Sequence, residues 1–273
     1  MADWGKIFSR GNVEDRRGNG LALGGGLGVV GVIVTLLYTF LSGGTLDLNQ
    51  VLGSLNGLTD QQNSLTSSDF EGADNYEVFA STVLGSTNDY WTQKVTNYQG
   101  PKLVLFRSAT ASGCGLATSD VGPHYCPADK TIYLDETFFQ ELQQRFKAKG
   151  GDVAEAYVIA HEVGHHVQNI TGTMDQIAHD NTQANSIALE LQADCYAGSW
   201  ANSVSTLGVF EPGEINEAVD AAAAVGDDRI QQSVTGQMSP ETWTHGSSEQ
   251  RVQWFNAGYN SGNPTACNTF ADL

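Results

Sequence analysis

Basic residues are scarce in this chain of 273 residues, which has 13 Lys and Arg against 31 Asp and Glu and a formal net charge of −18. Four of the basic residues lie among the first twenty residues: Lys6, Arg10, Arg16 and Arg17. Without the four basic and three acidic residues of that segment, 9 basic and 28 acidic residues remain. Nucleic-acid binding needs a basic patch that neutralises phosphates, so we expect no nucleic-acid partner.

Long apolar runs are scarce as well, and a single one reaches the length of a membrane span. Residues 21–41 carry no charge over 21 positions, and a helix of this length crosses a hydrocarbon layer of about 30 Å. We therefore expect one transmembrane helix there. Since basic residues precede it, the positive-inside rule predicts residues 1–20 to be a cytoplasmic basic tail and the chain after about residue 42 to be extracytoplasmic.

The alternative to this anchor is a cleaved signal peptide, which would put the rest of the chain in the same compartment. A long charged leader precedes the run and no clear small-x-small cleavage site follows Leu41. Both features favour a retained anchor and a single-pass membrane protein. Residues 42–70, rich in Ser, Gly, Asn and Gln, predict a flexible linker, which leaves residues 71–273 as the folded extracytoplasmic domain.

The four cysteines include no Cys-x-x-Cys pair, which argues against a zinc ribbon. In an exported domain, four cysteines favour two disulfides, and three pairings are open from the sequence. Cys114 and Cys126 flank a loop that contains Gly and Pro and are the natural local pair. This choice leaves Cys195 to pair with Cys267.

His161, Glu162 and His165 form a His-Glu-x-x-His sequence. Two imidazoles four residues apart on a helix project from one face and can hold one zinc ion, while the glutamate faces the open side of the metal. A helix over residues 152–169 is predicted by apolar residues at intervals of three and four, and Asp152 with Glu155 has the spacing of a capping box.

A catalytic zinc site needs a third protein ligand and keeps one position for water. A third His two turns later is excluded, because positions 168 and 171 hold Gln168 and Thr171. Glu190 and Asp194 lie one turn apart in a helix-compatible stretch. We expect Glu190 to bind the metal and Asp194 to accept the free ring N–H of a zinc-bound His, although such a pair on a charged helix is more often a solvated face.

These motifs resemble a known family. The segments HEVGHHVQ (161–168), ELQADCYAGSW (190–200) and THGSSEQRVQWF (244–255), with the cysteine-flanked segment 114–127 and residues 132–135, are similar to the "putative neutral zinc metallopeptidases" of bacteria, within the gluzincin-like group that combines HExxH with a downstream Glu. The resemblance implies the fold of that family, a bound Zn²⁺ and a peptidase activity on a peptide or protein substrate.

Catalytic roles follow from these residues. Glu162, which is not a ligand, would act as general base for a zinc-bound water. His245 is the candidate donor to the oxyanion, and Arg251, six residues later, is a second cation or a buried structural partner. A similar HxxxxxR element follows the third ligand in related membrane peptidases. The alternative is that His245 only caps a helix that starts at Ser247.

The expected fold is α+β, a mainly helical zinc-peptidase domain with a small β-sheet. Strands are predicted at Lys102–Arg107 and Thr131–Leu134, and a helix with Tyr76 and Trp91 opens the domain. Further helices are predicted over residues 135–149, 152–169, 175–204, 213–225 and 247–259. The predicted function is a membrane-anchored zinc endopeptidase. The alternative is a non-catalytic, metal-containing binding or scaffold module, which the presence of Glu162 argues against.

Overall fold

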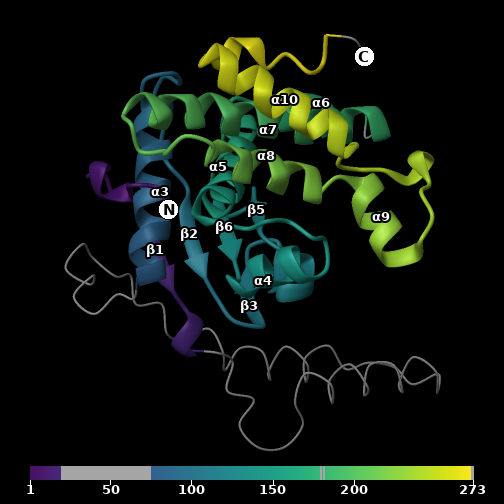
Figure 1. Ribbon diagram of the computed structural model, residues 1–273, viewed down its shortest axis with the longest axis horizontal. Helices are drawn as coiled ribbons and strands as arrows, with labels where there is room; N and C mark the ends of the chain where they lie inside the picture. The colour runs from purple at the N-terminus through teal and green to yellow at the C-terminus, as the bar shows by residue number, and fades with distance from the viewer. Residues whose placement is uncertain (20–74, 179, 181, 272–273) are drawn as a thin grey trace, which may run out of the picture. The chain divides into compact units, whose positions relative to one another are not determined.

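A computed structural model describes residues 1–19, 75–178, 180 and 182–271 (Figure 1). The predicted membrane helix over residues 21–41 and the predicted linker over residues 42–70 lie outside these residues. Among the described residues, no helix is both long enough and apolar enough to cross a membrane.

A four-stranded sheet lies at the centre of the β part, in the order β1-β2-β6-β5. Its strands are β1 (Val13–Asp15), β2 (Lys102–Leu105), β5 (His124–Cys126) and β6 (Thr131–Leu134). β1, β2 and β6 are parallel, whereas β5 runs antiparallel to β6 at one edge. A hairpin of β3 (Ala109–Ser112) and β4 (Gly115–Thr118) forms a second, two-stranded sheet. The two predicted strands are confirmed, with β2 ending at Leu105 rather than at residue 107.

The apolar run of β2 is continuous because both faces of this strand are covered. Leu103 and Leu105 belong to the main hydrophobic core. Val104 faces the other way, into a small cluster with Phe106 and Tyr133. The sheet is therefore fixed between two apolar layers and provides a rigid support for the helices.

The helices make up most of the described chain, which confirms the α+β class. They are α3 (Asn75–Thr92), α4 (Thr137–Gln144), α5 (Asp152–Ile170), α6 (Thr173–Ala178), α7 (Gln183–Thr206), α8 (Ile215–Ala224), α9 (Asp227–Thr235) and α10 (Ser248–Ser261). α5 is the central helix and packs against α3, α7, α8 and the strands β5 and β6 (Figure 1). The predicted helix over residues 175–204 is two helices, α6 and α7, because α7 starts anew at an N-cap in which the Thr182 side chain accepts from the Asn185 N–H. α9 was not predicted.

The N-terminal segment does not form the separate tail predicted for residues 1–20. Val13–Asp15 is β1, paired in register with Leu103–Leu105 of β2. Ile7 and Val13 are buried in the main core, so the described N-terminal residues and residues 75–271 belong to one compact unit. The sequence missed β1 because a three-residue strand has no recognisable periodicity, and its basic neighbours indicated a cytoplasmic tail.

The N-terminus of α5 also differs from the predicted capping box. The N-cap is Gly151, which makes no side-chain cap. The Asp152 carboxylate instead accepts from the Ala2 N–H and from the Trp4 indole N–H, both at 2.9 Å. A carboxylate at this position still interacts favourably with the positive end of the helix dipole, and here it fastens the N-terminal segment to the central helix.

Glu155, one turn into α5, has an environment that disfavours its charge. Burial, together with the nearby Asp152 carboxylate, raises its pKa to about 7. A carboxyl group with a raised folded-state pKa lowers stability once the pH exceeds its unfolded value, fully so above the folded pKa. We therefore expect Glu155→Gln to raise the free energy of unfolding at pH 8 by up to about 3 kcal/mol and to change it little at pH 4.

Denaturant unfolding at both pH values measures this effect. Glu141→Gln is the matched control, because Glu141 is an exposed glutamate in an i,i+4 pair with Arg145, and its change should stay below about 0.5 kcal/mol at either pH. Equal effects of Glu155→Gln at pH 4 and pH 8 would contradict the assigned cause.

Candidate active site

Close packing of α5 against α7 brings the predicted metal ligands together. A Cβ atom added at Gly164 would lie 3.0 Å from the Cα atom of Ala193, so the two helix backbones are nearly in contact there. A larger residue at Gly164 would push the helices apart. This approach places Glu190 of α7 beside His161 and His165 of α5.

The three side chains converge through their metal-binding atoms. His161 Nε2 lies 3.2 Å from Glu190 Oε2, and His165 Nε2 lies 3.4 Å from Glu190 Oε1. All three ligand atoms lie within 4.8 Å of one another, the one such group of at least three among the described residues. Ligand atoms around a tetrahedral zinc ion with bonds of ~2.0–2.1 Å are about 3.3–3.4 Å apart. The donor set and its spacing therefore fit a zinc ion.

Both imidazoles are oriented through their second nitrogen. His161 Nδ1 hydrogen-bonds to Asp194 Oδ1 at 2.9 Å, and His165 Nδ1 hydrogen-bonds to Gln168 Oε1 at 2.9 Å. Each partner oxygen accepts, so each Nδ1 donates and each Nε2 is directed toward Glu190. Asp194 thus has the orienting contact predicted for it, whereas the partner of His165 was not predicted.

The acidic neighbours of His161 also control its charge. Burial alone would lower the pKa of His161, but the carboxylates of Asp194 and Glu190 raise it to about 10. Burial would raise the pKa of Glu190, but His165 and His161 hold it well below its usual range. A metal ion bound here would displace a proton from the imidazole, so metal affinity should weaken as the pH falls.

Asp194 is a buried anion with a full set of partners. Arg251 of α10 binds it through two atoms, Nε to Oδ2 at 2.8 Å and Nη2 to Oδ1 at 3.0 Å. The Tyr157 hydroxyl donates to Oδ1 at 2.5 Å. Arg251 Nη1 also donates to the Val225 carbonyl at 3.2 Å. Of the two roles predicted for Arg251, the structure places it as a buried structural partner.

Glu162 and the three candidate ligands line one cavity of about 520 Å³, a size typical of ligand sites. Apolar side chains form part of its wall, including Phe138, Val158, Val225 and Ile230. The segment from Val121 to Tyr125, which leads into the edge strand β5, forms another part. The cavity therefore combines a polar centre with apolar walls and a strand edge.

His245 lines the same cavity and is held by a residue that was not predicted. Its side chain is 48% exposed, and its Nδ1 lies 3.0 Å from Asp227 Oδ1. Asp227 Oδ2 accepts from the backbone N–H groups of Thr244, His245 and Gly246. Burial would raise the pKa of Asp227, but these hydrogen bonds hold it below its usual range. His245 does not cap α10, because Ser247 and Gln250 form the capping box.

A comparison with known proteins agrees with this site. The chain matches the family described as "Putative neutral zinc metallopeptidase" over residues 2–270. It belongs to this family.

Two relatives of this zinc metallopeptidase family member are similar over long stretches. The protein YpfJ of Escherichia coli K12 is 42% identical over 279 aligned residues, which cover 95% of each chain. The protein Rv2575 of Mycobacterium tuberculosis H37Rv is 48% identical over 202 residues, which cover 69% of each chain. No solved structure matches the chain.

Two further residues of the candidate site in this family member have a local sequence signal. Tyr157 precedes His161 by four residues and Gln168 follows His165 by three, so both share the helix face of the ligands. Asp227 had no such signal, because it reaches His245 only through the fold. His166 is 1% exposed and hydrogen-bonds to the Tyr125 hydroxyl and the Gln99 carbonyl; it packs α5 against β5 and is not a ligand.

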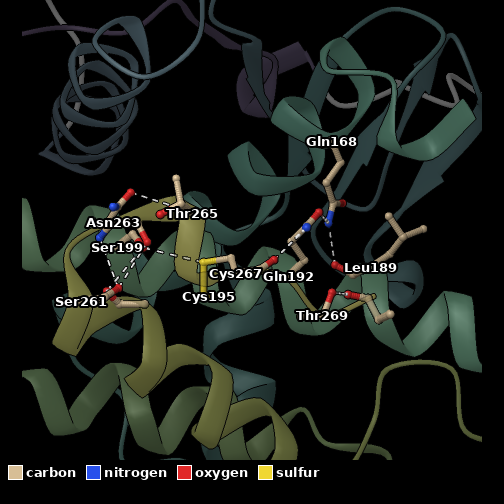
Figure 2. Close-up of a disulfide and its surroundings, with 12 residues drawn as sticks. Gln168, Leu189, Gln192, Cys195, Ser199, Ser261, Asn263, Thr265, Cys267 and Thr269 are labelled. Atoms are coloured by element: carbon tan, nitrogen blue, oxygen red, sulfur yellow. Dashed lines mark hydrogen bonds between the residues drawn. A yellow bond between two sulfur atoms is a disulfide. The ribbon is translucent and has the colours of Figure 1, made fainter. Parts of the chain in front are cut away.

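The two predicted disulfides are present. Cys114–Cys126 joins the β3–β4 hairpin to β5, which borders the cavity. Cys195–Cys267 joins α7, at the residue after Asp194, to the C-terminal segment (Figure 2).

Proposed function

We propose that this family member is a zinc-dependent endopeptidase, with zinc held by His161, His165 and Glu190 and with Glu162 as general base. The observation that carries the proposal is the convergence of these four side chains on one cavity, with both imidazoles oriented through Nδ1. Family membership supports the same activity class.

When bound, zinc supplies Lewis acidity, which polarises a peptide carbonyl and lowers the pKa of water to about 7. Glu162, which lines the cavity beside the candidate ligands, would take a proton from the attacking water and return it to the leaving amine. With Nδ1–H donating to Asp227, His245 would donate to the oxyanion through Nε2–H in its imidazolium form. Asp194, held by Arg251, would keep the His161 ring in its binding orientation.

The cavity suits an extended peptide. β5 is the edge of the sheet, and its outer side has no strand partner among the described residues. A substrate strand could pair along this edge and run past the ligands in both directions, which favours an endopeptidase. The apolar wall of Phe138, Val158, Val225 and Ile230 suits an apolar side chain of the substrate.

The alternative function is a binding or scaffold module that keeps the metal and lacks catalysis. Glu162 counts against it. This carboxylate is 6% exposed and lines the cavity, and neither the helix nor the metal ligation requires it. A module that only binds would have no use for a buried acid at the open side of the metal.

Zinc content is the first test of the proposal. The purified full chain is expected to hold close to one zinc ion per molecule by elemental analysis and to cleave an unfolded protein. His161→Ala should lose both, because two ligands hold zinc poorly. His124→Ala is the matched control, since this imidazole also borders the cavity and lies outside the ligand group. Wild-type zinc in His161→Ala would refute the ligand assignment.

His245 has a separate expected result. His245→Ala should lower kcat by about 10²- to 10³-fold, the usual effect of removing one oxyanion donor, while zinc content and KM change little. Asp227→Asn should give a smaller loss, because it weakens the orientation of the ring and leaves the donor in place. Steady-state kinetics on a peptide decide this, and an unchanged kcat in His245→Ala would remove the residue from the mechanism.

We also propose that the folded unit lies outside the cytoplasm and that residues 21–41 attach it to a membrane. Two disulfides support this compartment, because such bonds persist in oxidising environments. The pairing of β1 with β2 changes the expected location of the N-terminus. Strands that share hydrogen bonds lie on one side of a membrane, so a single crossing with a cytoplasmic N-terminus would separate β1 from β2. Residues 1–19 would therefore lie on the same side of the membrane as the catalytic residues, so residues 21–41 would attach the unit without crossing the membrane once. Labelling of Lys6 by an impermeant reagent only after cell lysis would contradict this topology.

A further inference from the structure

A chain of buried amides leads from a candidate metal ligand to the C-terminal segment, and Figure 2 shows its part from Gln168 through Gln192 to Cys267. His165 Nδ1 donates to Gln168 Oε1 at 2.9 Å, and Gln168 Nε2 donates to Gln192 Oε1 at 3.1 Å. Gln192 Nε2 donates to the Cys267 carbonyl at 2.9 Å. Gln168 is 0% exposed and Gln192 is 7% exposed, so water does not compete for these hydrogen bonds.

Two backbone carbonyls fix the direction of this chain. Gln168 Nε2 also lies 2.7 Å from the Leu189 carbonyl. A carbonyl only accepts, so the amide nitrogen of Gln168 must face Leu189, and its oxygen must face His165. The Cys267 carbonyl orients Gln192 in the same way, with its oxygen toward Gln168.

The orientation of the amides determines the tautomer of the ligand. Since Gln168 presents an oxygen, His165 must carry a proton on Nδ1, which leaves the lone pair of Nε2 directed toward Glu190. The Asp194 carboxylate fixes the tautomer of His161, whereas the neutral amide of Gln168 fixes that of His165. The amide adds no negative charge to a site that already holds Glu190, Glu162 and Asp194.

The last acceptor of the chain is held by a covalent bond. Cys267 forms a disulfide with Cys195. Cys195 lies on α7, about one helical turn after Gln192. Thr269 Oγ1 donates to the Ala188 carbonyl at 2.7 Å and fixes the segment on the other side of Cys267 (Figure 2). The C-terminal segment is thereby clamped along α7, directly behind the metal ligands.

We propose that Gln168 and Gln192 are positioning residues for His165 and that the Cys195–Cys267 disulfide holds the acceptor on which they depend. Zinc affinity is then coupled to a covalent bond in the C-terminal segment. This inference rests on the proposed zinc site. It predicts that the loss of contacts remote from the metal weakens zinc binding. The loss should be largest for the contact next to His165 and smaller for contacts further along the chain of amides.

Competition with a chromophoric chelator measures the zinc Kd of the full chain and its variants. Gln168→Leu removes the acceptor for His165 and should raise Kd by about 10- to 100-fold, the usual effect of losing an orienting partner. Gln192→Leu leaves that acceptor in place and should raise Kd less. Gln168→Glu keeps an oxygen toward His165 but loses the donor toward Leu189 and Gln192, so it should raise Kd less than Gln168→Leu. Equal Kd values for wild type and Gln168→Leu would overturn the proposal.

A signal from the imidazole separates positioning from general loss of structure. In the zinc-loaded protein, the His165 Nδ1–H resonance should be shifted downfield and protected from exchange. It should lose both properties in Gln168→Leu and keep them in Gln168→Glu. A protected resonance in Gln168→Leu would also overturn the proposal.

The two disulfides provide a matched pair of variants for the covalent part. Cys195→Ser with Cys267→Ser should weaken zinc binding, whereas Cys114→Ser with Cys126→Ser should leave Kd within about twofold, since that bridge touches no residue of the amide chain. Equal effects of both pairs would overturn the role of the bridge. If the first pair does not fold, Gln192→Leu decides, because it removes the contacts with Cys267 and Gln168 and leaves the contact between Gln168 and His165 in place. A wild-type protein without zinc would refute the proposed function itself, and one with zinc but an unaffected Gln168→Leu would refute only this inference.

Discussion

Replacing Glu162 with Gln is expected to lower peptide hydrolysis by about 10²- to 10⁴-fold, the usual contribution of a general base. The amide keeps the size of the side chain and removes the acceptor for the water proton. Zinc content should stay close to wild type, because Glu162 is outside the ligand group of His161, His165 and Glu190. Single-turnover hydrolysis of a peptide, with zinc analysis of the same sample, measures both quantities.

Glu190→Gln is the comparison that makes this result specific. A neutral amide binds zinc poorly, so this variant should lose metal and activity together, whereas Glu162→Gln loses activity alone. Wild-type hydrolysis by Glu162→Gln would refute the general-base role. A zinc-loaded wild type that cleaves nothing in a broad peptide library would instead favour the scaffold alternative.

Replacing Arg251 with Leu is expected to lower the free energy of unfolding by about 3–5 kcal/mol, because it leaves a buried charge without its partner. Asp194 is fully buried, and its two carboxylate oxygens both bind the guanidinium of Arg251, which is always charged. Although burial disfavours the charge on Asp194, Arg251 and His161 together hold its pKa below the usual range. Without Arg251 the carboxylate would rely on His161 and Tyr157 alone.

Denaturant unfolding of Arg251→Leu, Asp194→Leu and the double variant measures this coupling as a double-mutant cycle. The double variant should be less destabilised than the sum of the single variants, since it leaves no unpaired charge. Arg145→Leu is the control, because its ion pair with Glu141 is exposed and should contribute less than about 1 kcal/mol. An Arg251→Leu effect as small as that of Arg145→Leu would show that the buried pair is not a structural requirement.

The sequence predicted the cluster of candidate metal ligands because much of its geometry is local. Two His at an i,i+4 spacing share a helix face whatever the rest of the fold does, and the same holds for Glu190 and Asp194. Sequence periodicity therefore located both faces, and the requirement for a third ligand joined them. The match to HExxH and its downstream Glu supplied the pairing of the two helices.

Contacts between distant segments were the part that local patterns could not predict. Asp227 contacts His245 because α9 and the loop before α10 come together. Gln192 contacts the Cys267 carbonyl because a disulfide holds Cys267 against α7. Neither contact leaves a periodic pattern, since each depends on how helices pack. The closeness of α5 and α7 is similar: Gly164 fits the HExxH pattern, but its role became clear only with the Cα atom of Ala193 beside it.

The pairing of β1 with β2 has a consequence for the order of folding. Val13 is in register with Leu103, about 90 residues later in the chain, so this contact has a high loop-closure entropy and raises the contact order of the sheet. Until β1 arrives, the edge of β2 remains open, and an unpaired edge of an apolar strand promotes association between chains. β1 is the first strand to be synthesised, and we therefore expect it to be among the last to pair with the sheet.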